Sequence, residues 1–308
     1  MTAPVLTRLV GSASVVLDPW PEEASADVLT TADPTPFLVS RKARKLMGLQ
    51  DELAVVSVGH ALERAGLTAP LGPRVGLYLA VGYIPFREAD LAPVLAGSIE
   101  DGAFSPRRFG TDGSQRAHPF LTFRCLPNMP AYHVSASFGL TGPYVVAYPG
   151  GGQLGLVLEE AVAALARREI EVAVVLGVTH ARNFLVEQGY AKLSPPVPPE
   201  ALRDAAACLV LRPDDAAIAD FPGLASLTLG YAPRSTMLFD GALREEHLAI
   251  DGVVAPVPEL GPATLPDAIH RAFARSAKTV RHHLLARDGL VVDDVWNAGT
   301  AGPKAGRS

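Results

Sequence analysis

The chain has 308 residues, of which 48% are hydrophobic and 19% charged, and its formal net charge at pH 7 is −5. Its length suits one large α/β unit or two closely packed halves, with enough apolar side chains for a substantial core. The acidic balance gives no general attraction to nucleic acid or to an anionic membrane, so neither is an expected partner.

Residues 1–17 lack the basic start and continuous apolar segment of a signal peptide, and no 18 successive residues are all apolar, so no membrane span is expected. Cys125 and Cys208 are far apart and lie in apolar segments, which favours reduced thiols over a disulfide. We therefore expect a cytoplasmic protein.

Predicted strands and helices alternate along the chain. Asp51 is a suitable N-cap for the first helix, which ends before Gly66, and the polar, glycine-rich residues 97–118 predict a loop. This alternation is typical of a parallel α/β sheet with helices on both faces. Strands are predicted at residues 6–17, 74–82, 144–148, 172–178, 206–211, 224–231 and 291–296, and helices at residues 51–65, 126–138, 153–168 and 265–285.

Residues 142–155, GPYVVAYPGGGQLG, predict a strand, a glycine-rich turn and the start of a helix, the arrangement that displays a nucleophile in many enzymes. With the preceding residues 128–142, NMPAYHVSASFGLTG, they resemble the β-ketoacyl synthases of the thiolase superfamily. There an Asn-Met element and a Gly-Leu-x-Gly-Pro turn precede a strand that ends at a catalytic Cys. Alignment on residues 145–147 places Pro149 at the Cys position, and alignment on Leu154 places Gly150 there. Neither residue can attack a thioester.

The resemblance covers more of the chain. Residues 9–16, 41–47, 53–66, 74–82, 169–178 and 203–213 are each similar to a family segment, and they imply a complete N-terminal half over residues 1–215. Residues 216–308 would form a shortened C-terminal half of the same compact unit. The expected fold is thus α/β, a thiolase-like layered α/β/α fold with a truncated C-terminal half.

The family's catalytic histidine is also missing. Residues 296–302, WNAGTAG, stand where the family has His-Gly-Thr-Gly-Thr, and Ala298 occupies the His position. The chain ends before the region of the family's Lys and second catalytic His. Decarboxylative condensation needs a thiolate to accept the acyl group and imidazoles to stabilise the enolate, so the chain alone is not expected to be an enzyme.

The resemblance therefore implies a pseudoenzyme similar to a chain-length factor, most like the short subunits of aryl-polyene systems. Such a subunit forms a heterodimer with an active ketosynthase and meets the acyl carrier protein indirectly, without a cofactor or metal. In the family, the strand that ends at the nucleophile position lies at the subunit interface, here Tyr144, Val145, Val146, Ala147 and Tyr148. Bulky side chains before Asn128 and just after it are the corresponding candidates for lining the acyl tunnel: Phe120, Leu121, Phe123, Leu126, Met129 and Tyr132.

Alternative interpretations remain open. The scaffold could support an acyl-thioester hydrolase or acyltransferase that uses Cys125, or a homodimeric acyl-binding protein. The glycines of residues 150–155 also satisfy a dinucleotide-binding pattern, but no acidic residue ends the next predicted strand to bind a ribose. His270, His282 and His283 fall in the predicted helix 265–285, where a solvated surface is favoured over a metal site.

Overall fold

The first half of the chain builds a five-stranded mixed sheet. The computed structural model describes residues 7–20, 26–83, 86, 88–148, 152–192, 196–232, 245–257, 259–286 and 289–299. The sheet order is β1-β8-β7-β3-β6, and the short β2 (Val28–Leu29) lies parallel to β1. Its strands are β1 (Thr7–Val16), β3 (Val75–Val81), β6 (Tyr144–Ala147), β7 (Val172–Thr179) and β8 (Ala205–Pro213).

The prediction of a parallel sheet is wrong at one strand of this sheet, and it is also wrong for the antiparallel strands of the second half, described below. β3 runs parallel to β6 and β7, whereas β8 is antiparallel to both of its neighbours, β7 and β1. In its described residues, the chain between β7 and β8 contains the short helix α7 (Phe184–Tyr190) and a 3-10 turn (Pro199–Ala201), and it returns to the adjacent position in the sheet. Without a crossover, the next strand must run in the opposite direction.

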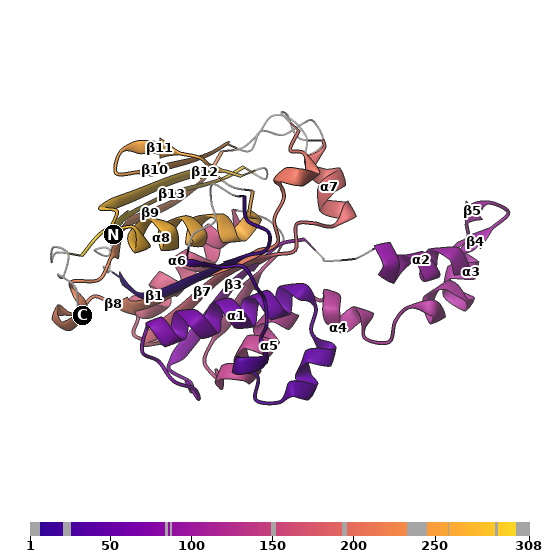
Figure 1. Ribbon diagram of the computed structural model, residues 1–308, viewed down its shortest axis with the longest axis horizontal. Helices are drawn as coiled ribbons and strands as arrows, with labels where there is room; N and C mark the ends of the chain where they lie inside the picture. Colours follow the sequence, from indigo (N-terminus) through magenta and orange to yellow (C-terminus); the bar gives the residue numbers. More distant parts are fainter. Residues whose placement is uncertain are drawn as a thin grey trace.

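Helices α1 (Leu49–Arg64) and α5 (Met129–Phe138) cover the outer face of this sheet (Figure 1). Asp51 is the third helical residue of α1 rather than its N-cap, and its Oδ2 accepts a hydrogen bond of 2.7 Å from the Gly48 N–H. The predicted helix 126–138 is shorter in the structure, because α5 begins at Met129, with Pro130 in its first turn, where a missing N–H is tolerated. A separate short helix, α4 (Leu121–Cys125), precedes it.

The second half forms an antiparallel sheet in the order β9-β13-β12-β10-β11. Within the described residues, its strands join those of the first half where Thr7 and Arg8 of β1 pair with β9, so the two sheets are continuous at this point. Its strands are β9 (Gly223–Tyr231), β10 (Glu245–Ile250), β11 (Val253–Ala255), β12 (Thr279–Leu285) and β13 (Leu290–Asn297).

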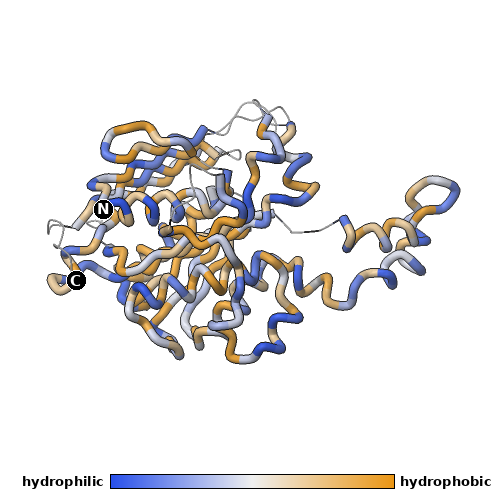
Figure 2. The backbone as a smooth tube through the Cα atoms, in the orientation of Figure 1, coloured by the Kyte–Doolittle hydropathy of each residue, from blue (hydrophilic) through white to orange (hydrophobic). Residues whose placement is uncertain are grey.

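Helices α6 (Gln153–Ala166) and α8 (Thr264–Ala274) lie between the two sheets, so the molecule is layered helix, sheet, helix, sheet (Figure 1). One hydrophobic cluster contains Leu158 of α6, Ile269 of α8, Leu209 of the first sheet and Trp296 of the second. The hydropathy-coloured trace shows the most apolar stretches following the central strands (Figure 2). Burial of both faces explains why these strands are continuous apolar runs.

The predicted helix 265–285 is wrong in its second part, because α8 ends at Ala274 and residues 279–285 form β12. Burial along β12 alternates, with His282 buried and His283 partly exposed. A period of two is the signature of a strand, and its inward face contacts the central helices.

Residues 88–116, which we call the arm, project from the body of the molecule (Figure 1). A loop was predicted for most of this segment, and that prediction is wrong. The arm contains α2 (Glu88–Gly97), the hairpin strands β4 (Ile99–Glu100) and β5 (Ala103–Phe104), α3 (Pro106–Thr111) and a 3-10 turn (Gly113–Arg116). In the described part of the chain, no helix is both long enough and apolar enough to cross a membrane.

Candidate functional site

The candidate site lies where the parallel strands β3, β6 and β7 end. Ala80 of β3 pairs with Ala147 on one side and with Gly177 on the other, so all three strands finish at the same edge of the sheet. From β6 the chain continues through the glycine-rich residues 149–152 to the N-terminus of α6. Ligands of α/β proteins bind preferentially at such an edge.

Close backbone contacts explain the small residues at the start of α6. A Cβ on Gly155 would lie 2.6 Å from Val292 Cγ2, and one on Gly152 would lie 2.8 Å from Ala286 Cβ. The first turn of α6 is therefore held directly against the second sheet. The two positions aligned with the family's nucleophile, Pro149 and Gly150, lie outside the described residues.

A second close approach shapes the same edge. A Cβ on Gly177 of β7 would lie only 2.0 Å from the carbonyl oxygen of Pro262, in the 3-10 turn (Gly261–Ala263) that precedes α8. This turn therefore closes over the end of β7 and brings the start of α8 to the candidate site.

A buried His-Asp pair follows β7. His180 Nδ1 lies 3.0 Å from Asp204 Oδ1, and both side chains are buried. Asp204 also accepts a hydrogen bond from the Arg182 backbone N–H at 3.0 Å. Sequence reasoning missed this pair because no local pattern connects residues 24 positions apart.

Behind the first turn of α6, His282 is held between two carboxylates. Its Nδ1 is 2.9 Å from Asp294 Oδ2 and its Nε2 is 3.0 Å from Glu246 Oε1. Burial would lower the pKa of His282, but the hydrogen bonds to Asp294 and Glu246 outweigh it and raise the pKa to about 10. His282 is therefore a cation with both ring nitrogens occupied, suited to holding β10, β12 and β13 together rather than to accepting a proton.

This ionic cluster borders a cavity of about 10 Å³ that also contacts Leu154 and Gly155 of α6. A space of this size is close to that of one water molecule. The expectation that His282 lies on a solvated helix is thus wrong, whereas His283 is exposed and its Nδ1 lies 2.7 Å from Asp293 Oδ1. The alternation along β12 separates the two histidines onto opposite faces.

Most of the candidate tunnel residues are not part of the core. Met129 is buried and Leu121 is half-buried, whereas the remaining four are 40–57% exposed: Phe120, Phe123, Leu126 and Tyr132. The centroids of the Phe120 and Phe123 rings are 6.4 Å apart, and the ring planes are inclined at 66°. Contiguous apolar side chains with this exposure are typical of interaction surfaces and ligand-binding grooves.

The candidate interface strand is the open edge of the first sheet. Among the described strands, β6 pairs only with β3. Tyr144 is 64% exposed and Tyr148 is also exposed, whereas Val145, Val146 and Ala147 are half-buried. The outward backbone groups of β6 and the exposed Tyr144 side chain are accessible to another chain.

The remaining candidate positions are Ala298 and the two cysteines. Ala298 follows β13, and its N–H donates to the Lys278 carbonyl oxygen at 2.7 Å. Cys208 is fully buried in β8, where burial strongly raises the pKa of its thiol, and Cys125 is buried at the end of α4. Within the described ranges, no cluster of His, Cys, Asp and Glu could hold a metal ion.

A larger cavity of about 460 Å³ lies at the opposite edge of the sheet, near the residues that precede β3 and β7. It is lined by Arg74 and Glu171, which form an exposed ion pair, together with Arg212 and Asp214. Because it is at the amino ends of the parallel strands, it is separate from the candidate site.

Comparisons with known proteins agree with this architecture. The family model described as β-ketoacyl synthase, N-terminal domain, matches residues 20–201, which is more than half of the chain. No curated protein matches the chain.

Solved structures match over nearly the whole chain. One is a type II polyketide acyl carrier protein in complex with its ketosynthase bound to the hexaketide, with a TM-score of 0.66, 13% identity and coverage of 96% of this chain and 100% of that chain. Another is a β-ketoacyl synthase from Burkholderia phymatum STM815, with a TM-score of 0.61, 13% identity and coverage of 95% and 99%. A third is the ketosynthase from module 6 of the bacillaene synthase of Bacillus subtilis 168, with a TM-score of 0.61, 11% identity and coverage of 96% and 71%. At these identities the likeness establishes the fold.

Proposed function

Because the chain belongs to the β-ketoacyl synthase family, we propose that it is a non-catalytic subunit of the chain-length-factor type. It pairs with an active ketosynthase and shapes the tunnel for the growing acyl chain in type II polyketide or polyene biosynthesis. The acyl carrier protein then meets the complex mainly through the ketosynthase.

The junction between β6 and α6 carries this proposal. Condensation begins when an acyl group is transferred to a thiolate whose pKa is lowered at a helix N-terminus. Residues 148–153, Tyr-Pro-Gly-Gly-Gly-Gln, contain neither a thiol nor an aliphatic hydroxyl. The chain has the strand and the helix that would position a nucleophile, but it lacks the nucleophile itself.

The cysteines elsewhere offer no simple substitute. Cys208 is enclosed in the first sheet, and Cys125 is 7% exposed. A nucleophilic thiol needs access to substrate and an environment that stabilises the thiolate. The burial of both thiols therefore favours the non-catalytic interpretation over a hydrolase or acyltransferase that uses Cys125.

Pairing with a ketosynthase is supported by the open edge at β6. An exposed edge strand is a template for another strand, and tyrosines are frequent at protein interfaces. The exposed Phe120, Phe123 and Tyr132 lie on the segments between the arm and β6, which suits a tunnel wall shared with the partner. Large apolar side chains there would limit the length of the bound chain.

Co-expression with the ketosynthase encoded beside this chain tests the proposal. The two are purified through a tag on this chain alone and assayed for condensation with acyl and malonyl carrier-protein thioesters. We expect a one-to-one complex whose condensation activity is lost when this chain is omitted. A well-behaved monomer or homodimer that does not bind the ketosynthase, or condensation by this chain alone, would refute the proposal.

Substitutions in the complex test the tunnel. Phe120→Ala and Phe123→Ala should each shift the product distribution towards longer chains, measured by mass spectrometry. Phe221→Ala is the matched control, because Phe221 is similarly exposed but lies just before β9. An unchanged distribution in both tunnel variants would remove these residues from the tunnel wall.

A further inference from the structure

The cavity at the amino ends of β3 and β7 lies at the opposite end of the parallel strands from the candidate site. Its volume of about 460 Å³ falls within the range of about 300–1,000 Å³ that is typical of small-molecule sites. Its lining comes from the end of α6 and the residues that lead into β7, from the residue before β3, and from the end of β8 with the 3-10 turn (Ala216–Ile218) that follows. The proposed function makes no use of this cavity.

The buried part of the lining is apolar. Leu165 and Ile170 are each 1% exposed, and both belong to the hydrophobic cluster between the two sheets. Pro213 and Ile218 are half-buried and extend this apolar surface on the side of β8. Such a surface favours a ligand with an apolar portion, because binding then removes apolar area from water.

The carboxylates at the cavity already have partners. Glu171 is paired with Arg74 at 3.1 Å, and Asp214 is paired with Arg8 at 2.5 Å. Asp215 caps the 3-10 turn after β8, because its Oδ1 accepts a hydrogen bond of 3.1 Å from a backbone N–H of that turn. A bound cation would therefore have to compete with these partners.

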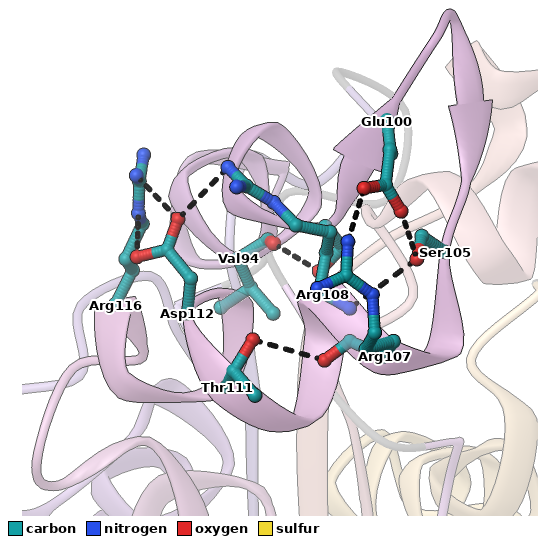
Figure 3. Close-up of polar contacts among 9 residues, drawn as sticks. Val94, Glu100, Ser105, Arg107, Arg108, Thr111, Asp112 and Arg116 are labelled. Atoms are coloured by element: carbon teal, nitrogen blue, oxygen red, sulfur yellow. Dashed lines mark hydrogen bonds and ion pairs between the residues drawn. The ribbon is translucent and has the colours of Figure 1, made fainter.

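Two arginines at the same cavity have no such partners. Among the described residues, no hydrogen bond or ion pair reaches the guanidinium group of Arg168 or of Arg212. In the arm, by contrast, Arg107, Arg108 and Arg116 all pair with nearby carboxylates (Figure 3). A guanidinium group binds the oxygens of a phosphate or a carboxylate through parallel N–H donors, so these two arginines are suited to an anionic head group.

The backbone at Arg168 supports a role for its side chain. Arg168 follows the end of α6 with a φ of 58°, in the left-handed region that favours glycine. Its N–H donates to the Leu165 carbonyl oxygen at 3.0 Å, and the Glu169 N–H donates to the Ala164 carbonyl oxygen at 3.0 Å. Glycine would close the helix in the same way with less strain, so ending the helix does not explain the arginine.

The charge around the cavity differs in sign from that of the whole chain. Counting Arg8 with its partner Asp214, four guanidinium groups and three carboxylates surround the cavity, an excess of one positive charge. The whole chain has a formal net charge of −5. This local excess attracts an anion at short range.

We infer that this cavity binds an amphipathic anion, with a phosphate or carboxylate head held by Arg168 and Arg212 and an apolar portion against Leu165, Ile170 and Ile218. Alkyl phosphate esters and fatty carboxylates share this chemistry. The inference does not depend on the proposed function, because the cavity is separate from both β6 and the junction of β6 and α6.

Isothermal titration calorimetry of the full chain tests the ligand class with four probes. Hexyl phosphate and hexanoate carry both an anionic head and an apolar portion, whereas inorganic phosphate lacks the apolar portion and hexanol lacks the anionic head. We expect at least one of the two amphipathic anions to bind at least tenfold more tightly than inorganic phosphate and hexanol, and the anion with the lower Kd identifies the head group. A chain that binds neither anion, or that binds inorganic phosphate or hexanol equally well, would overturn the inference.

Two double variants locate the binding. Arg168→Gly with Arg212→Gln removes both guanidinium groups, and glycine suits the left-handed backbone at position 168, so this variant should fold. Arg275→Gln with Arg281→Gln is the control, because it removes the same charge from exposed positions that do not line the cavity. We expect the cavity variant to raise Kd at least tenfold and the control variant to leave Kd within twofold. An unchanged Kd in the cavity variant, or equal losses in the two variants, would show that the cavity is not the site.

Discussion

Removing the positive charge of His282 tests whether the buried ionic cluster holds the second sheet together. The substitution His282→Asn keeps an N–H near Asp294 but leaves the two carboxylates, Asp294 and Glu246, without a cation between them. We expect a large loss in the free energy of unfolding near neutral pH, because an uncompensated charge is then buried. The Trp296 Nε1–H, which donates to Asp294 at 2.9 Å, would remain as a neutral partner.

The magnitude follows from the pKa of His282. The cluster raises that pKa from 6.5 to about 10, and each pKa unit corresponds to about 1.36 kcal/mol. This sets an upper bound of about 5 kcal/mol on the contribution of protonated His282 to the free energy of unfolding. Breaking a buried ion pair typically costs about 3–5 kcal/mol. The side chain is 3% exposed, so solvent does not screen the interaction.

The pH dependence has a definite sign. Because the folded state raises the pKa, protonated His282 contributes fully to stability below about pH 6.5. That contribution is lost as the pH rises through about 10. The difference in stability between the unsubstituted chain and His282→Asn should therefore be largest below pH 6.5 and should shrink steadily towards pH 10.

Denaturant unfolding at a series of pH values measures this difference. His283→Asn is the matched control, because His283 is the adjacent residue on the opposite face of β12 and its ion pair with Asp293 is exposed. We expect the control to cost less than about 1 kcal/mol. Equal losses in the two variants, or a loss at His282 that does not vary with pH, would refute the assignment of a buried cation.

Three further predictions follow from other buried positions. Burial raises the pKa of Asp51 to about 8, so the free energy of unfolding should fall as the pH rises from about 4 to about 8. Asp51→Asn should flatten this fall, and an unchanged pH profile would contradict the reasoning. Gly177→Ala places a Cβ 2.0 Å from the Pro262 carbonyl oxygen and should lower the free energy of unfolding by about 1–3 kcal/mol or more. Gly189→Ala is the control, because its Cβ would meet no atom within 4 Å. Thermal unfolding should show this control to be neutral or stabilising. Cys125 and Cys208 should both react slowly with a thiol reagent until the chain unfolds, and fast labelling of Cys125 that an acyl substrate blocks would favour the enzyme alternative.

Much of the first half could be predicted from the sequence. The apolar runs at residues 74–82 and 172–178 predict β3 and β7, and the helical spacing of apolar residues predicts α6. The family resemblance, which rests on short motifs around β6, is confirmed by the family match. The absence of a nucleophile between β6 and α6 is also a property of the sequence, because residue type alone decides whether a thiol is present. The chain-length-factor role, the tunnel residues and the interface strand stay predictions.

Only the tertiary structure showed how the second half and the arm are arranged. Residues 279–285 carry no apolar pattern strong enough to separate strand from helix, and pairing with β10 and β13 decides the outcome. Strand pairing likewise brings Glu246, His282 and Asp294 together from three strands, β10, β12 and β13, as the return of the chain brings Asp204 to His180. Local periodicity determines which residues can face a core, whereas the contacts of a buried polar group depend on segments far apart in the sequence.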